Sequence, residues 1–224
     1  MTWPVLVINM AANTTRMAHA AAELERLDIP FTRFEAVDGR ALSVADLARV
    51  YDPVANLRRA RHPMVGPEIG CYLSHIALWK HIAASDAAVV KLFSARKVQK
   101  LLGSRPLVAD REIAVPYKVP NTTLGYAIRR DTAARLAACA LPVSRPVDED
   151  HKYFWELGLR IALVTPSPLA FGVQSAETGT ITAARRQKTV PNNGAALRQM
   201  WRSICYRISY IGKLHWYRLV RRLR

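Results

Sequence analysis

Residues 66–79 bring several chemically active side chains to the start of one predicted helix. Pro67 and Glu68 suit a first helical turn, because proline lacks the N–H that would be unpaired there and the helix dipole favours a carboxylate. Cys71, Ser74 and His75 follow three or four residues apart and therefore share one face. A thiol, a hydroxyl and an imidazole on one face can contact a ligand, or they can be satisfied inside a core. The residue pattern leaves both interpretations open.

The densest group of acidic side chains is the run Asp148-Glu149-Asp150-His151. Neighbouring carboxylates repel one another and so raise each other's affinity for a proton. Asp148 is therefore a candidate general base that takes a proton from a hydroxyl group. The same run fits a helix start, with Asp148 as N-cap and the next two acids in the first turn. Both roles are compatible, and the pattern favours a chemical role for Asp148 over one for His151.

The first forty residues predict the elements that position a site. Residues 5–9 form a short, β-branched, apolar run that is typical of a buried strand. A helical stripe follows over residues 17–27, and residues 31–37 alternate as a second strand. This order predicts an α/β fold with a mostly parallel sheet flanked by helices. Ligands bind outside the carboxyl ends of such strands, which here hold Asn9, Arg16 and the loop 36–39.

The side chains at these strand ends suit a nucleotide sugar. Arg16 could neutralise a diphosphate with its planar set of donors. Asp38 could accept hydrogen bonds from ribose or sugar hydroxyls, and Gly39 would let the backbone approach a ligand closely. The simpler alternatives are an exposed helix arginine and an ordinary Asp-Gly turn. The chain has no glycine-rich phosphate loop, which disfavours an ATPase or an NAD enzyme.

The chain resembles glycosyltransferase family 25, which includes bacterial lipopolysaccharide galactosyltransferases. The helix at residues 66–79 is similar to the family signature Glu-x-Gly-Cys-x-x-Ser-His. Four further blocks occur in the family's order, and they comprise residues 7–10, 34–40, 123–128 and 146–148. The resemblance runs from about residue 4 to residue 172 and implies a GT-A-like, that is Rossmann-like, domain over residues 1–172.

This resemblance also implies substrates and site residues. It implies a UDP-sugar donor whose hexose, galactose, is transferred to a lipopolysaccharide-type glycan acceptor. It places Asp148 at the acidic position of a family motif, where it would be the catalytic base. The implied substrate-binding residues are Asn9, Arg16, Ala36, Val37, Asp38, Gly39, Glu68, Gly70, Ser74, His75 and Asp150.

The metal motif of the family is missing from the chain. After the signature helix the family continues through a strand into Glu-Asp-Asp, whose carboxylates hold Mn²⁺ or Mg²⁺ against the departing UDP. Residues 87–97 contain no acidic residue, and Lys91 stands where the first carboxylate is expected. One interpretation is an inactive relative that binds nucleotide or a partner without turnover. The others are metal-free catalysis, in which Lys91, Arg96 or Lys97 neutralises the diphosphate, and a metal held by residues 148–150.

The basic charge of the chain is concentrated in its C-terminal part. The 224 residues include 33 Lys and Arg against 17 Asp and Glu, a formal charge of +16. No acidic residue follows Glu177, whereas eleven basic residues lie between Arg185 and Arg224. Localised charge of this kind points to an anionic surface that the tail contacts. The three cysteines lack CxxC spacing, which argues against a disulfide framework or a zinc site and fits a reducing compartment.

Residues 195–224 predict a basic amphipathic helix, separated from the body by a linker over residues 173–194. Its apolar stripe repeats at four-three spacing and consists of Leu197, Trp201, Ile204, Ile208 and Ile211. Apolar, aromatic and cationic side chains together suit a helix in an anionic membrane interface. Since no apolar run reaches transmembrane length, we expect a cytoplasmic protein bound peripherally to the inner face of the cytoplasmic membrane. The alternatives are a helix docked on the body and, less favoured without an RNA-binding motif, nucleic-acid binding.

Overall fold

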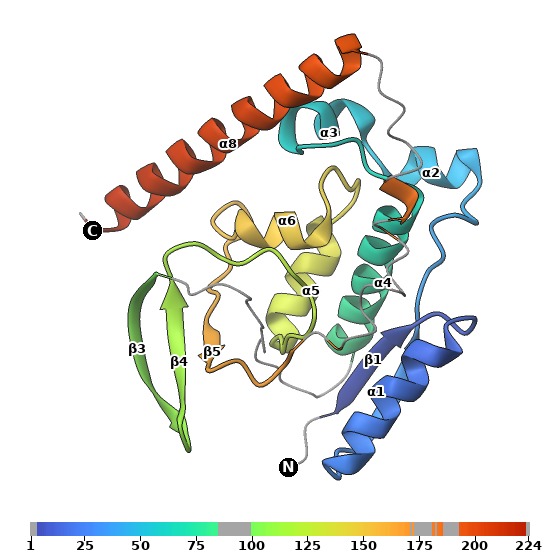
Figure 1. Cartoon of the computed structure of the whole chain (residues 1–224), viewed down its shortest axis with the longest axis vertical. Coiled ribbons are helices and arrows are strands. Elements are labelled where there is room, and N and C mark those ends of the chain that lie inside the picture. Colours follow the sequence, from blue (N-terminus) through green and yellow to red (C-terminus); the bar gives the residue numbers. More distant parts are fainter. Residues whose placement is uncertain are drawn as a thin grey trace.

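The structure is a computed structural model that describes residues 4–84, 100–170, 172, 181, 183–185 and 193–222. It begins with strand β1 (Val5–Asn9), helix α1 (Thr14–Arg26) and strand β2 (Phe31–Glu35). β1 and β2 pair in parallel along their whole length. A parallel pair needs a crossover connection, and α1 supplies it (Figure 1). The predicted βαβ start is therefore confirmed.

Three helices follow the first strand pair: α2 (Val44–Val50), α3 (Pro53–Arg59) and α4 (Gly66–Ala83). α2 begins where Ser43 Oγ accepts the N–H of Asp46 at 3.0 Å, a side-chain cap for an otherwise unpaired donor. α4 has proline in its first turn, as predicted, and its residues are buried on nearly every side. A helix that is apolar all round belongs in the middle of a domain, and α4 occupies that position.

A separate antiparallel sheet consists of β3 (Leu101–Val108), β4 (Arg111–Pro116) and β5 (Leu163–Thr165), in that order. β3 and β4 are joined by a turn at Ala109 and Asp110. So short a turn can join only antiparallel neighbours. The α/β class is confirmed, but the prediction of one mostly parallel sheet is wrong for the described residues. They form one parallel strand pair and one antiparallel sheet.

The core lies where α4 packs against α5 (Arg130–Cys139) and α6 (Val147–Lys152). From α4 it contains Ile69, Tyr72 and Trp79, all of which are buried. Figure 1 shows α4 between α5 and the unit formed by β1 and α1. The carboxyl ends of the parallel strands are therefore close to the first turns of the most buried helix.

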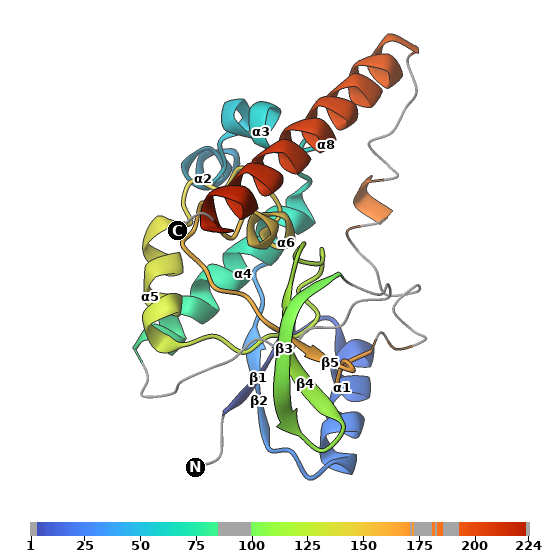
Figure 2. The same cartoon turned by 90° about the vertical axis from the view of Figure 1, so that its left-hand side faces the viewer.

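The last described helix, α8, extends over Asn193–Arg222 and lies across the body near α3 and α6 (Figure 1 and Figure 2). Tyr206, Tyr210 and Leu214 are buried in this contact. Lys152 of α6 donates from Nζ to the hydroxyl of Tyr206 at 3.1 Å. One face of α8 is therefore part of the core of the protein.

Most of the predicted linker, residues 173–194, lies outside the described residues, so the predicted domain division stays a prediction. Within the described part of the chain, no helix is both long enough and apolar enough to cross a membrane.

Candidate functional site

The loop after β2, residues 36–39, lies directly on the first turns of α4, and we call it the strand-end loop. Glycines on both segments leave room for this backbone contact. A Cβ added to Gly39 would lie 1.9 Å from the carbonyl oxygen of Gly66. A Cβ added to Gly70 would lie 2.3 Å from the amide nitrogen of Gly39. Only glycine permits so close an approach of two backbones. The close approach predicted for a ligand at Gly39 is made here by α4.

Ser74 holds this contact together with two hydrogen bonds. Its Oγ accepts the N–H of Val37 at 2.8 Å and donates to the carbonyl oxygen of Gly70 at 2.7 Å. The N–H of Ala36 donates to the carbonyl oxygen of Asn9 at 3.1 Å. The end of β1, the loop and α4 are thereby joined into one unit. This unit contains the predicted residues Asn9, Ala36, Val37, Gly39, Gly70 and Ser74.

Asn9 has an unused acceptor at the carboxyl end of β1. The residue is 4% exposed, and its Nδ2 donates to the carbonyl oxygen of Asn13 at 3.2 Å. Its Oδ1 is buried and has no hydrogen-bond partner among the described residues. An unpaired buried acceptor costs about 1–3 kcal/mol, so buried amide oxygens normally have a partner. Asn9 Oδ1 is therefore suited to accept a hydrogen bond from a ligand.

Asp38 is ionised and engaged by its neighbour. Arg40 donates from Nε to Oδ1 at 2.8 Å and from its terminal nitrogen to Oδ2 at 2.7 Å. These hydrogen bonds, with a further one from the Arg40 N–H, lower the pKa of Asp38 to about 2. A ribose or sugar hydroxyl can reach Asp38 only at the lone pairs that Arg40 leaves open.

The charges of side chains from three helices act on the thiol of Cys71 in α4. Burial, together with the negative charges of Asp148 and Glu68, raises the pKa of the Cys71 thiol to about 11. The positive charge of Arg16 opposes this shift. Arg16 belongs to α1, Glu68 to α4 and Asp148 to α6, so three predicted site residues from different helices influence this thiol. The thiol itself stays protonated at neutral pH, which argues against a role as nucleophile.

The carboxyl of Asp148 has the environment of a base. Burial raises its pKa, and the negative charge of Glu68 acts in the same direction. The N–H of Glu149, which donates to Asp148 Oδ1 at 2.9 Å, acts against it. A carboxylate with a raised pKa accepts a proton more readily near neutral pH. The acids do lie in the first turn of α6, but the N-cap is Pro146, so the expectation of Asp148 as N-cap is wrong.

Glu68 connects the start of α4 to the C-terminal part of the chain. Its Oε2 accepts the N–H of Val65 at 3.0 Å, and its Oε1 forms an ion pair with Arg185. The carboxylate is buried, whereas the Arg185 side chain is 44% exposed. The charge of Arg185 also acts on Asp148. Arg185 therefore adds a second cation, besides Arg16, to the surroundings of the predicted diphosphate site.

Asp150 is engaged in a buried ion pair. The hydroxyl of Tyr72 donates to its Oδ2 at 2.5 Å, and Arg145 Nε donates to its Oδ1 at 2.6 Å. The Arg145 side chain is 1% exposed, and it also donates to Glu156 at 2.8 Å. Its guanidinium carbon lies 4.0 Å from the centre of the Tyr153 ring. These contacts give Asp150 a structural role in joining α4 to α6, beside the substrate-binding role predicted for it.

His75 contacts a different neighbour from Ser74, although the two are adjacent on α4. Its Nδ1 lies 2.6 Å from the hydroxyl of Tyr126, which also accepts from Trp79 Nε1 at 2.8 Å. The His151 ring packs edge-on against Tyr126 with centroids 5.8 Å apart. The predicted face of α4 is therefore divided. Ser74 contacts the strand-end loop, whereas His75 contacts the aromatic group, which consists of Trp79, Tyr126 and His151.

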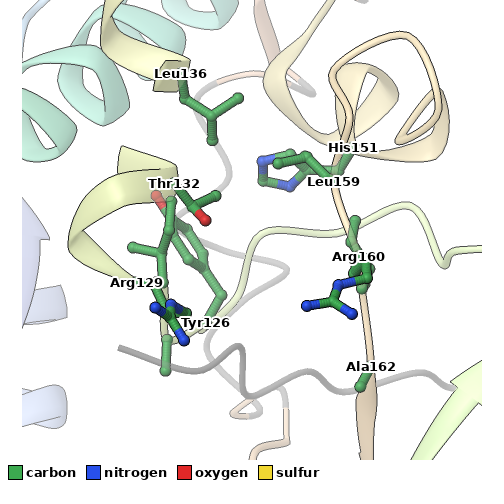
Figure 3. A pocket seen from close by; sticks show the side chains of 11 residues that line it. Tyr126, Arg129, Thr132, Leu136, His151, Leu159, Arg160 and Ala162 are labelled. Atoms are coloured by element: carbon green, nitrogen blue, oxygen red, sulfur yellow. The ribbon is translucent and has the colours of Figure 1, made fainter. Parts of the chain in front are cut away.

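A pocket of about 190 Å³ opens beside the aromatic group (Figure 3). Arg129 and Arg160 lie on opposite sides of the pocket, as Figure 3 shows. Apolar and aromatic side chains form much of the rest, among them Tyr126, Leu136, His151 and Leu159. None of the predicted substrate-binding residues lines this pocket, so it is a space separate from the strand-end site.

The acidic run does not form a metal site. No group of three or more His, Cys, Asp or Glu side chains in the described ranges could hold a metal ion. Successive side chains of a helix point about 100° apart, so three consecutive acids of α6 cannot converge on one ion. Both oxygens of Asp150 are in addition already engaged. The interpretation of residues 148–150 as a metal site is therefore wrong, whereas Lys91, Arg96 and Lys97 lie outside the described residues.

Two residues that organise the site were not predicted. Arg145 lies three residues before the first acid of the acidic run, and that proximity could have indicated an ion pair. Arg185 has no comparable signal, because its partner Glu68 lies 117 residues earlier in the chain.

Comparison with known proteins shows which family this α/β protein resembles. The model described as "Glycosyltransferase family 25 (LPS biosynthesis protein)" matches residues 2–95. Residues 2–95 therefore match glycosyltransferase family 25, and the resemblance predicted from the motifs is confirmed.

Two rodent proteins are similar to the chain. "Inactive glycosyltransferase 25 family member 3" of Mus musculus is 32% identical over 216 residues, which cover 72% of this chain and 36% of the mouse protein. "Probable inactive glycosyltransferase 25 family member 3" of Rattus norvegicus is 32% identical over 94 residues, which cover 40% of this chain and 16% of the rat protein. The chain thus corresponds to only a part of each relative.

Proposed function

We propose that the chain binds a UDP-sugar in a GT-A-like manner at the carboxyl ends of β1 and β2. The observation that carries this proposal is the unit in which Ser74 holds the loop after β2 on α4 beside the buried, unpaired Oδ1 of Asn9. The charges of Arg16, Glu68 and Asp148, which all act on the nearby Cys71 thiol, support it. Such a site combines cations for a diphosphate with carboxylates for sugar hydroxyls.

Individual roles follow from the contacts of each residue. Arg16 and Arg185 supply positive charge for the diphosphate. Asn9 Oδ1, which is buried and unpaired among the described residues, accepts a hydrogen bond from the nucleoside or sugar. Asp38 receives a hydroxyl at the lone pairs that Arg40 leaves open. The glycines and Ser74 act indirectly, because they fix the loop that carries these groups.

We further propose that the reaction is transfer of a hexose, galactose, to a lipopolysaccharide-type glycan. The acceptor hydroxyl gives its proton to the carboxylate of Asp148, and its oxygen forms the new bond to the anomeric carbon. The bond from that carbon to UDP breaks, and UDP leaves with the electron pair. Positive charge from Arg16 and Arg185 stabilises the departing diphosphate. Because the described acids do not fit Mn²⁺ or Mg²⁺, no step is assigned to a metal.

The acceptor also bears on location. A lipopolysaccharide-type glycan is anchored in a membrane, and UDP-sugars are the proposed donors. The proposed function therefore places the protein in the cytoplasm, peripherally on the inner face of the cytoplasmic membrane.

Calorimetric titration of the full chain with UDP-galactose, together with UDP release in the presence of glycan acceptors, tests the proposal. We expect Asp148→Asn to lower turnover by about 10²–10⁴-fold, the usual contribution of a general base, while binding changes little. Asp131→Asn, which removes an exposed carboxylate of α5, is the matched control and should retain turnover. Absence of nucleotide-sugar binding by the unmodified chain would refute the proposal.

A second candidate function is binding of nucleotide or a partner without turnover. Two observations favour it: residues 87–97 lack the family's acidic motif, and both rodent relatives are named inactive or probable inactive proteins. This candidate predicts metal-independent UDP binding and no release of UDP from a UDP-sugar with any acceptor tested. Turnover that disappears in Asp148→Asn would exclude it.

A further inference from the structure

Large apolar side chains are exposed along one face of α8. We call this the outer face, and it consists of Leu197, Trp201, Ile204, Ile208 and Ile211, which are between 40% and 67% exposed. These are the residues of the apolar stripe visible in the sequence. Soluble surfaces rarely present so many large apolar side chains in one row, and such a row marks an interaction surface.

The outer face points away from the body. With about 100° between successive helix residues, its five members fall within an arc of about 80° that is opposite Tyr206 and Tyr210. Those tyrosines are buried against α6 and its neighbours. α8 therefore has two different faces, and the residues of the outer face remain 40–67% exposed while the tyrosine face is docked on the body.

Positive charge flanks the outer face on both sides. Arg198 and Arg207 lie about 90° to either side of its centre line by the same helical geometry, and both are exposed. Residues 193–222 contain no Asp or Glu. An apolar row that is bordered by cations and lacks acids is complementary to a partner with an apolar interior and a negatively charged outer layer.

We propose that the outer face of α8 binds the interface of an anionic lipid membrane while the tyrosine face stays docked on the body. The outer face is about 21 Å long from Leu197 to Ile211, and it would lie in the plane of the interface, since this helix cannot span a membrane. Arginine side chains at the edges reach the headgroups while the apolar side chains enter the acyl boundary.

Charge favours lipid over the other possible occupants. A second copy of a chain with a formal charge of +16 would bring like charges together at Arg198 and Arg207. Nucleic acid would satisfy the arginines but would leave the isoleucines without apolar partners. This surface does not depend on the proposed glycosyltransferase reaction, and it can be tested without a substrate.

Point substitutions on the outer face test the proposal better than removal of α8, because removal would also take Tyr206 and Tyr210 out of the core. The measurement is co-flotation of the full chain with vesicles of equal parts phosphatidylglycerol and phosphatidylcholine. We expect the double substitution Trp201→Ser and Ile208→Ser to lower the partition coefficient at least tenfold. Arg198→Gln with Arg207→Gln should weaken binding and reduce its dependence on salt.

Matched controls distinguish the contribution of the outer face to vesicle binding from that of apolar side chains and positive charges elsewhere on the surface. Val44→Ser with Leu57→Ser removes two exposed apolar side chains elsewhere, and Lys80→Gln with Arg105→Gln removes two positive charges elsewhere. Both controls should bind vesicles like the unmodified chain, and circular dichroism should show all variants folded. Equal loss in the controls, or no binding of the unmodified chain to these vesicles, would overturn the proposal.

The other occupants give distinct results. A dimer in sedimentation equilibrium that Trp201→Ser with Ile208→Ser dissociates, without vesicle binding, would show a second copy on the outer face and contradict the lipid assignment. Preferential, salt-sensitive binding to RNA over the vesicles would contradict it equally.

Discussion

Ser74 and the glycines around it were predicted to bind a ligand, and in the structure they contact backbone atoms of neighbouring segments. The hydroxyl of Ser74 is fully used between Val37 and Gly70, so it has no proton left to give a ligand. Gly39 and Gly70 are required because a side chain at either position would collide with backbone atoms. These residues thus determine where the strand-end loop lies, and the loop in turn positions the groups that meet a ligand.

Gly70→Ala tests this packing role. The added methyl would lie 2.3 Å from the Gly39 nitrogen and 2.6 Å from the Val37 oxygen, and backbone atoms cannot move aside easily. We expect the free energy of unfolding to fall by about 1–3 kcal/mol, although alanine is otherwise the better helix former. Urea unfolding followed by circular dichroism measures the change.

Gly212→Ala is the control for this prediction, because Gly212 is also helical and nothing lies within 4 Å of an added Cβ. It should raise the free energy of unfolding by up to about 1 kcal/mol. If the two substitutions changed the free energy of unfolding equally, the strand-end loop would not be packed tightly against α4.

The sequence could predict these residues as a group but not their partners. Residue types and spacing indicated that Gly39, Gly70 and Ser74 matter, and the structure brings them together. What spacing cannot reveal is whether a glycine leaves room for a ligand or for another backbone segment, since both need the same missing Cβ. The pairing of Glu68 with Arg185 was equally out of reach, because it joins residues far apart in the chain.

At the scale of elements, α8 shows why hydrophobicity alone does not tell which face docks. The row from Leu197 to Ile211 is the more apolar face, yet it is exposed. The face that docks carries Tyr206 and Tyr210, whose rings pack on Tyr153 while Lys152 reaches the Tyr206 hydroxyl. Tyr206 thus buries a large ring and still satisfies a polar contact, whereas the buried hydroxyl of Tyr210 has no hydrogen-bond partner among the described residues.

Tyr210→Ala and Ile208→Ala compare the two faces within one helix. Tyr210 is 3% exposed, and its loss should lower the free energy of unfolding by about 3–5 kcal/mol, as for other large aromatic truncations. Ile208 is 67% exposed, and its loss should change that energy by no more than about 0.5 kcal/mol. Thermal and urea unfolding measure both. A large loss for Ile208→Ala would place the outer face in the core and remove the basis for its binding to lipid.

At the scale of the whole molecule, the acids near the candidate site are shielded from solvent, whereas most acids elsewhere are exposed. Glu68 and Glu149 are buried and Asp148 is partly so, while most of the basic residues of α8 are exposed. Sequence composition could predict the basic tail, since a count along the chain is enough. It could not predict the buried acids, because their burial depends on how α4, α6 and α8 pack. Burying a carboxylate costs free energy unless partners compensate for it, and this cost can be tested at Asp148.

Asp148→Asn should therefore stabilise the protein at neutral pH while it removes the proposed base. Burial raises the pKa of Asp148 in the folded state above its value in the unfolded chain. At a pH above both values the folded protein bears the cost of a buried charge, and asparagine removes that cost. Below both values the carboxyl is neutral in either state, so the advantage of asparagine is lost as pH falls through the raised pKa towards the unfolded one.

Urea unfolding from pH 8 to pH 3 should show that Asp148→Asn raises the free energy of unfolding at the upper end and that this gain declines on acidification. The exposed Asp131, whose pKa is lowered by the N–H of Thr132, provides the comparison, because Asp131→Asn should give no such gain. A gain for Asp148→Asn that is absent at pH 8, or that persists unchanged at pH 3, would show that the carboxylate is not held in a destabilising environment, and the assignment of Asp148 as the base would lose its physical support.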